Sequence, residues 1–229
     1  MTIYAWPGWG AARFELRVIP NLRTFAGPYT PTTQILDLLG ERWAARIDLP
    51  PTNNSIEGAA REAFFDRLKG MAHQIAVWHL KLPAPQGTLR SDTAAVSVVN
   101  ASLASVAVVN ASSAAVSVLI GGAPTTAAAV SQLSNTAIIN TLAGRTVRAG
   151  DMLGIAGQLV RVMADATANG AGQMAIEFQP RARIAWPLYS AVVWDKPAAN
   201  FMLKAADGVS TAWVPGRADG CSFELIEVP

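Results

Sequence analysis

The stretch Arg13-Phe-Glu-Leu-Arg-Val-Ile19 alternates apolar and charged side chains along its whole length. In an extended chain Phe14 and Leu16 fall on one face, and the charged residues fall on the other. Arg42-Trp-Ala-Ala-Arg-Ile-Asp-Leu49 repeats the pattern, with Trp43 on its apolar face. A period of two predicts half-buried antiparallel strands, so we expect Phe14, Leu16 and Trp43 in the core.

Short runs of the same kind continue to the C-terminus. Met174, Ile176 and Phe178 alternate in one of them, and Ser222 to Val228 forms the last. Residues typical of turns, such as Gly150-Asp151, separate the runs. Many short strands at this spacing predict a mainly β chain, built as an antiparallel β-sandwich or barrel.

One amphipathic α-helix is expected at about residues 55–69. Asn54-Ser-Ile-Glu57 resembles a capping box, in which the glutamate reaches back to the amide of the cap residue. Phe64 and Leu68 lie four residues apart and are the expected anchors on a sheet. Gly70 then supplies the left-handed residue that commonly ends helices.

The middle of the chain carries no charged residue between Thr93 and Gly144. Val96-Ser-Val-Val-Asn-Ala-Ser102 returns as Val106-Ala-Val-Val-Asn-Ala-Ser112, and a weaker copy starts at Val116. The valine spacing also fits a helix, but β-branched pairs with Asn at each repeat end favour strands and turns. We therefore predict a β-repeat insertion at 91–144, within a main β domain formed by 1–90 with 145–229.

Composition favours an assembly over a monomer. The chain has 229 residues, 15% of them charged, against roughly 25% in an ordinary soluble domain. Large uncharged surfaces usually mark interfaces. We also expect the N-terminal Trp6-Pro-Gly-Trp9 segment to dock on a neighbouring subunit. The predicted interface residues are Trp6, Trp9, Val96, Val98, Val106, Val108 and Val116.

Residues that carry chemistry are sparse, so we expect no enzyme and no catalytic, cofactor or metal site. His73 and His79 are too far apart in an extended strand to share a metal ion. Asp151 and Asp165 have turn neighbours, which favours turn capping over paired catalytic carboxylates. The single cysteine, Cys221, is expected to pack in a strand.

The charge pattern and the N-terminus limit which partners are expected. The net charge is +2 and no basic run is present, so firm binding of nucleic acid is not expected. The N-terminus lacks the features of a signal peptide, and Asn and Ser residues interrupt the apolar tract, so we expect no membrane insertion. A rival hypothesis is a carbohydrate- or receptor-binding module that uses Trp6 and Trp9 as a stacking platform.

An ordered series of short motifs resembles the distal tail proteins of long-tailed, siphovirus-like bacteriophages. The likeness spans most of the chain, and the order of the motifs is more specific than any one of them. The neutral repeat tract departs from the family pattern, which usually has a shorter glycine-rich connection there. The motifs are Trp6-Pro7, Asn21, Phe25-Ala-Gly-Pro28, Gly40-Glu-Arg-Trp43, the helix from Ala60 to Gly70, Pro83-x-x-x-Gly87, Ala149-Gly150-Asp151, Gly154-x-x-Gly157-Gln-Leu159, Ala171-Gly-Gln-Met-Ala-Ile176 and Gln179-Pro-Arg-Ala-Arg183.

The resemblance implies a structural virion protein of the phage tail tip. Such proteins form a homo-oligomeric ring, commonly a hexamer, that joins the tail tube protein to the baseplate hub. DNA passes through the ring without specific binding. The implied location is the virion, with assembly in the host cytoplasm, and a ring of three copies is the alternative symmetry.

Overall fold

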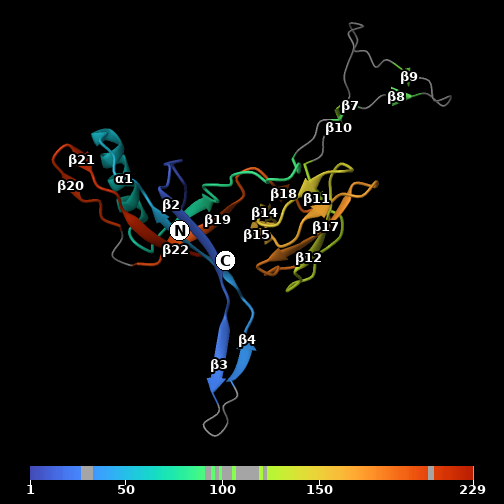
Figure 1. Cartoon of the computed structure of the whole chain (residues 1–229), viewed down its shortest axis with the longest axis horizontal. Coiled ribbons are helices and arrows are strands. Elements are labelled where there is room, and N and C mark those ends of the chain that lie inside the picture. The colour runs from blue at the N-terminus through green and yellow to red at the C-terminus, as the bar shows by residue number, and fades with distance from the viewer. Residues whose placement is uncertain are drawn as a thin grey trace.

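The computed structural model describes residues 1–26, 33–90, 94–95, 98–99, 105–106, 119–120, 123–205 and 209–228. Within these residues the fold is mainly β, with one α-helix, two six-stranded sheets and several two-stranded ribbons (Figure 1). This arrangement confirms the predicted fold class. The alternating runs form strands because one face of each is apolar and is covered by the core.

The first sheet contains both alternating segments that define the fold class. Its edge strand β2 pairs along its whole length with β5, and β5 pairs in turn with β22 near the C-terminus. The described pairs are antiparallel except β1 with β6. In spatial order the strands are β1 (Ile3–Ala5), β6 (Gln74–Trp78), β19 (Ala198–Leu203), β22 (Ser222–Glu227), β5 (Arg42–Asp48) and β2 (Arg13–Ile19).

The second sheet is built from residues between 125 and 193. Its central hairpin turns at Ala156 and Gly157, which have φ of 49° and 80° as a two-residue type I′ turn requires. In spatial order the strands are β11 (Thr125–Thr126), β12 (Thr136–Asn140), β17 (Gln173–Gln179), β15 (Gln158–Val162), β14 (Met152–Ile155) and β18 (Val192–Val193).

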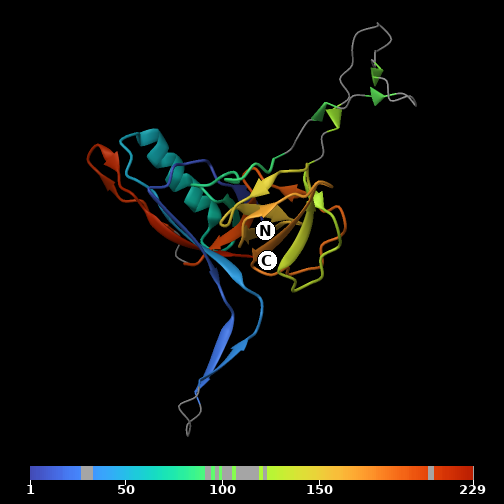
Figure 2. The same ribbon diagram turned by 45° about the vertical axis from the view of Figure 1, so that its right-hand side comes forward.

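Five two-stranded ribbons complete the described strands. Most are short, and one of them, the β3–β4 ribbon, extends away from both sheets in two views (Figures 1 and 2). The pairs are β3 (Leu22–Ala26) with β4 (Thr33–Asp37), β7 (Ala94–Ala95) with β10 (Leu119–Ile120), β8 (Val98–Val99) with β9 (Ser105–Val106), β13 (Thr146–Val147) with β16 (Ala166–Thr167), and β20 (Trp213–Val214) with β21 (Arg217–Ala218).

The helix α1 spans Ser55–Leu68, close to the predicted range. The Asn54 side chain accepts hydrogen bonds from the backbone N–H groups of Ile56 and Glu57, as an N-cap should. The expected return contact from Glu57 to the cap amide is absent, because that carboxylate accepts from Thr52 and pairs with Arg61. None of the described helical residues forms a segment with the length and apolar character of a membrane span.

The buried face of α1 contains one of its two predicted anchors, Leu68, while Phe65 takes the place of Phe64. Phe65 and Leu68 are buried, whereas Phe64 is only half-buried against the same core. Arg61 is also buried, although it is charged, and it donates to the carbonyl oxygen of Pro50 at 2.6 Å. The helix therefore anchors through Phe65 and Leu68, with Phe64 covered from the side by Trp9.

The predicted core residues of the first half are buried to different extents. Trp43 and Leu68 have no exposed surface. Phe14 and Leu16 pack against the core but remain half-buried. Both lie on β2, an edge strand with a neighbour on one side only, and this position explains their incomplete burial.

Two hydrophobic cores correspond to the two sheets, and Trp43 joins them. The indole N–H of Trp43 donates to the carbonyl oxygen of Leu159 on β15 at 2.8 Å. Arg161, also on β15, lies over the Trp43 ring at 4.9 Å and donates to the carbonyl oxygen of Leu16. Leu159 itself belongs to the core of the first sheet. The two sheets are therefore packed directly against each other.

The second sheet shifts the boundary of the predicted insertion. We expected 91–144 to be separate from the main β domain, but β11 and β12 lie inside this range and belong to the second sheet. Ile139 on β12 is fully buried in the second core. An insertion can therefore extend no further than residue 122, because the chain after it is part of a packed sheet.

Candidate assembly surface

The β3–β4 ribbon, called the arm below, carries several exposed large apolar side chains. Its strands pair only with each other. Leu22, Phe25, Leu36 and Leu38 on or beside it are 48, 52, 49 and 43% exposed, and none belongs to either core. Five-residue strands make the ribbon about 17 Å long. An isolated two-stranded ribbon is at best marginally stable in water, so the arm is a candidate surface for contact with another chain.

Hydrogen bonds at the base fix the direction of the arm. The Asn21 side chain donates to the carbonyl oxygen of Leu39 at 2.9 Å, and the backbone N–H of Leu38 donates to that of Asn21. Asp37 accepts from the backbone N–H of Leu39, which has φ of 55°. Pro20 lies between β2 and β3 and has no N–H to continue the pairing. The base is thus a defined bend, and the arm leaves the body at a set angle.

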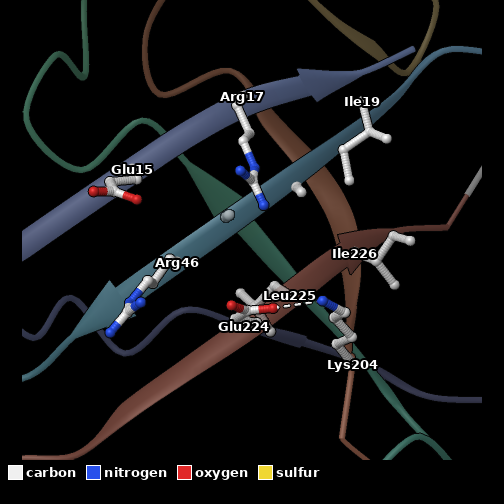
Figure 3. Close-up of a pocket in the computed structure, with 10 residues that line it drawn as sticks. Glu15, Arg17, Ile19, Arg46, Lys204, Glu224, Leu225 and Ile226 are labelled. Atoms are coloured by element: carbon white, nitrogen blue, oxygen red, sulfur yellow. Dashed lines mark hydrogen bonds and ion pairs between the residues drawn. The ribbon is translucent and has the colours of Figure 1, made fainter.

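The outer face of the first sheet carries charges that alternate across the strands (Figure 3). Opposite charges in direct cross-strand positions stabilise a sheet, whereas like charges would destabilise it. Lys204 pairs with Glu224 at 2.7 Å, and this contact is the main reason that the pKa of Glu224 is lowered. Residues in direct cross-strand register form rows on this face. The row farthest from the arm is Arg13, Asp48 and Ser222, and the next is Glu15, Arg46, Glu224 and Lys204. The third row is Arg17, Ala44, Ile226 and Met202, and the row nearest the arm is Ile19 and Arg42.

The last two rows, next to the arm, contain cations without acids. We call Arg17, Ile19, Arg42 and Ile226 the basic patch. Figure 3 shows Arg17 reaching from β2 across β5, with Ile19 and Ile226 beside it. Two adjoining hollows of about 140 and 170 Å³ share Ile19 and Ile226. The ion pairs of the described residues include neither Arg17 nor Arg42, although the charge of Arg17 contributes to the lowered pKa of Glu224.

Trp6 is a core residue of this chain, which corrects its expected role at an interface. It is 3% exposed and lies edge-on to Trp9 and Phe64, at 5.7 and 6.3 Å between ring centroids. The strand β1 places it there by running parallel to β6. Trp9 is half-buried against the same cluster. The platform that the carbohydrate-binding hypothesis requires is therefore not formed by these two residues.

The predicted interface valines of the neutral tract are described only in part. Val96, Val108 and Val116 lie outside the described residues. Val98 on β8 is the direct antiparallel partner of Val106 on β9. Between residues 91 and 122 the described residues form the short strands β7, β8, β9 and β10.

The two histidines flank β6 and do not form a common site. His73 lies edge-on to Tyr4, at 5.8 Å between ring centroids. His79 accepts a hydrogen bond from the backbone N–H of Leu82 through Nδ1 at 2.9 Å and lies edge-on to Phe14. Burial, and then the nearby Arg161, lower the pKa of His79. Both imidazoles thus have structural partners.

Asp151 and Asp165 bind backbone amides, as turn-capping residues do. Asp151 is 2% exposed and accepts from the N–H groups of Gln86, Gly87 and Arg148. Asp165 is exposed and accepts from the N–H of Ala149, which together with the Arg148 guanidinium lowers its pKa. The two carboxylates serve different turns.

Other reactive groups are also occupied or dispersed. Cys221 is buried, and burial raises the pKa of its thiol. Within the described ranges no three His, Cys, Asp or Glu side chains gather in a way that could hold a metal ion.

Neither a protein-family model nor a curated protein matches this sequence.

Sequence reasoning missed the arm because its signal is weak. The local sequence predicts a turn at Phe25-Ala-Gly-Pro-Tyr29, of which residues 27–29 lie outside the described residues, and a strand from Thr32 to Leu38, which corresponds to β4 at Thr33–Asp37. Leu22, Phe25 and Leu36 look like ordinary strand residues in the sequence. Their exposure follows from the tertiary structure, because none of the described strands pairs with the outer side of β3 or β4.

Proposed function

We propose that this chain is a structural assembly protein whose copies associate through the arm. By its resemblance to distal tail proteins, it is a virion protein of a phage tail tip, formed as a ring in the host cytoplasm. The ring joins the tail tube protein to the baseplate hub, and DNA passes through it without sequence-specific binding. A net charge of +2 suits that passage, because phosphate binding grows with each cation presented.

The projecting arm with its four exposed large apolar side chains is the observation that carries the proposal. Full burial of such a side chain contributes about 1.5–3 kcal/mol, and each is about half exposed, so their burial contributes about 3–6 kcal/mol per arm. Association costs an estimated 4–15 kcal/mol in lost freedom. The arm therefore supplies part of the association energy, and other surfaces must supply the rest.

A head-to-tail ring fits this balance. An arm that leaves one subunit and lands on a different surface of the next makes a heterologous contact, which closes into a ring when the rotation allows. Each subunit then both donates and receives an arm. Closure adds a further contact without additional loss of freedom, so a modest interface becomes stable.

The oligomeric state of the purified chain tests the proposal. Light scattering coupled to size-exclusion chromatography and negative-stain imaging should show ring-shaped oligomers at micromolar concentration. The double variant Phe25→Ser with Leu36→Ser should shift the chain to monomer, because both side chains are half exposed and outside the cores. Leu142→Ser is the matched control, because Leu142 is 42% exposed but lies on the second sheet's loops.

Two results would contradict the proposal. One is a monomer that forms no rings at micromolar concentration, even with the tail tube and hub proteins present. The other is a double arm variant that assembles as well as the Leu142→Ser control.

A further inference from the structure

The two faces of the arm carry opposite charges. Direct partners in an antiparallel pair share a face, and neighbours along a strand alternate. Leu22 is the partner of Asp37, whereas Arg23 is the partner of Leu36. These strands contain one acid and one base, and the two lie on opposite faces. One face of the arm is thus apolar and acidic, and the other is apolar and basic.

The basic patch has the complementary composition. It combines the guanidinium groups of Arg17 and Arg42 with the side chains of Ile19, which is 39% exposed, and Ile226. Glu15 and Glu224 also line the 140 Å³ hollow, but the bases Arg17, Arg46 and Lys204 outnumber them, so its lining is net positive. An acid beside an exposed leucine on the arm therefore matches a base beside an exposed isoleucine on the sheet. The small side chain of Ala44, between Arg17 and Ile226 in the same row, leaves the hollow into which a neighbouring side chain can fit.

We infer that the acidic face of the arm of one copy lies on the basic patch of a second copy. This inference rests on the proposed function, since it requires that copies associate. Asp37 lies at the base of the arm, and the ion pairs of the described residues do not join it to Arg17 or Arg42 of its own chain. The rest of the arm extends away from the sheet (Figures 1 and 2). The Asp37 carboxylate uses one oxygen for the backbone N–H of Leu39, which leaves the other for a guanidinium.

The inference also selects which face of the arm docks. Arg23 on the opposite face would meet Arg17 and Arg42 with like charge if the arm were turned over, and like charges across an interface disfavour that orientation. The contact with the patch therefore uses Leu22 and Asp37. Arg23, Phe25 and Leu36 lie on the other face of the arm, and the burial of that face in the assembly requires a different surface of a neighbouring copy.

Single charge removals on the two faces form a matched pair. Asp37→Asn keeps an oxygen for the Leu39 amide but removes the charge, and it should weaken association about tenfold at low salt. Arg23→Gln removes one charge from the other face and should change association less than twofold. Sedimentation velocity over a concentration series measures both. Equal effects of the two variants would refute the choice of face.

A charge swap decides whether the two sites meet. The single variant Asp37→Lys should reduce association, and so should the double variant Arg17→Glu with Arg42→Glu. The triple variant that combines these changes should restore association to within about threefold of the wild type. Circular dichroism confirms that each variant folds, and the exposed positions make that the expected outcome. At 0.5 M NaCl the differences should shrink, because salt screens exposed charges.

The possible failures are distinguishable. If wild-type copies assemble but the patch variants have no effect, the patch serves another, acidic partner, and the inference fails while the proposed function stands. Losses that add in the combined variant also refute it. A wild-type chain that stays monomeric overturns both.

Discussion

Replacing Asp151 with Asn tests whether this carboxylate is a structural clamp. Its Oδ1 accepts from the backbone N–H of Gln86 at 2.7 Å, and its Oδ2 accepts from those of Gly87 and Arg148 at 3.3 and 2.7 Å. An asparagine of the same shape has one oxygen and one NH₂ group. At least one buried N–H donor would then face another donor and lose its acceptor.

The expected destabilisation follows from this geometry. A hydrogen bond to a charged group contributes about 1.5–3 kcal/mol, and a buried donor left without an acceptor costs about 1–3 kcal/mol. The neutral amide escapes the cost of burying a charge, which offsets part of the loss. We therefore expect Asp151→Asn to lower the free energy of unfolding by about 2–4 kcal/mol.

Equilibrium urea unfolding followed by circular dichroism measures the effect. The control is Asp165→Asn, which changes the same group where it is exposed and should cause a much smaller loss. Measurement at two protein concentrations separates folding from assembly. If Asp151→Asn unfolds at the same urea concentration as the wild type, or no earlier than Asp165→Asn, the Asp151 carboxylate does not stabilise the contact between the segments at Gln86–Gly87 and Arg148.

Two further predictions concern the junction of the two sheets. Trp43→Phe removes the donor to the buried Leu159 carbonyl and should lower the free energy of unfolding by about 1–3 kcal/mol in urea titrations; a change below the measurement error would contradict this. The pKa of His79 is lowered in the folded chain from its ordinary value of 6.5. As the pH falls below about 6.5, the unfolded chain therefore binds a proton at His79 more readily than the folded chain, and the free energy of unfolding should decrease. His79→Asn should flatten this dependence and His73→Asn should not; equal slopes in all three proteins would argue against His79 as its source.

Element types were largely predictable from local pattern. The alternation in 13–19 and 42–49 predicted β2 and β5, because a period of two places apolar groups on one face of a strand. Asn54 predicted the start of α1, because capping depends on neighbours in the chain, whereas the left-handed C-cap is Lys69, one residue before the predicted Gly70. The role of Asp151 as a turn cap was also visible in its sequence context.

The candidate site was much less predictable. The basic patch combines Arg17 and Arg42 with Ile226, residues far apart in the sequence that meet only because β22 pairs with β5. The exposure of the arm depends on the absence of a third strand beside β3 and β4, and no local pattern reports that absence. Trp6 was misplaced for the same reason, since its burial depends on the pairing of β1 with β6.

By itself, the sequence determined that the chain is mainly β, where its helix lies, and that its charged residues are few, because these properties depend on composition and on neighbours within a few positions. The tertiary structure decided which face of α1 is buried and that the chain after residue 122 contributes strands to a second sheet. It also decided that several large apolar side chains are exposed on a projecting arm. These outcomes depend on which strands pair over long distances, and the free energy of such pairing comes from packing between segments rather than from any one of them.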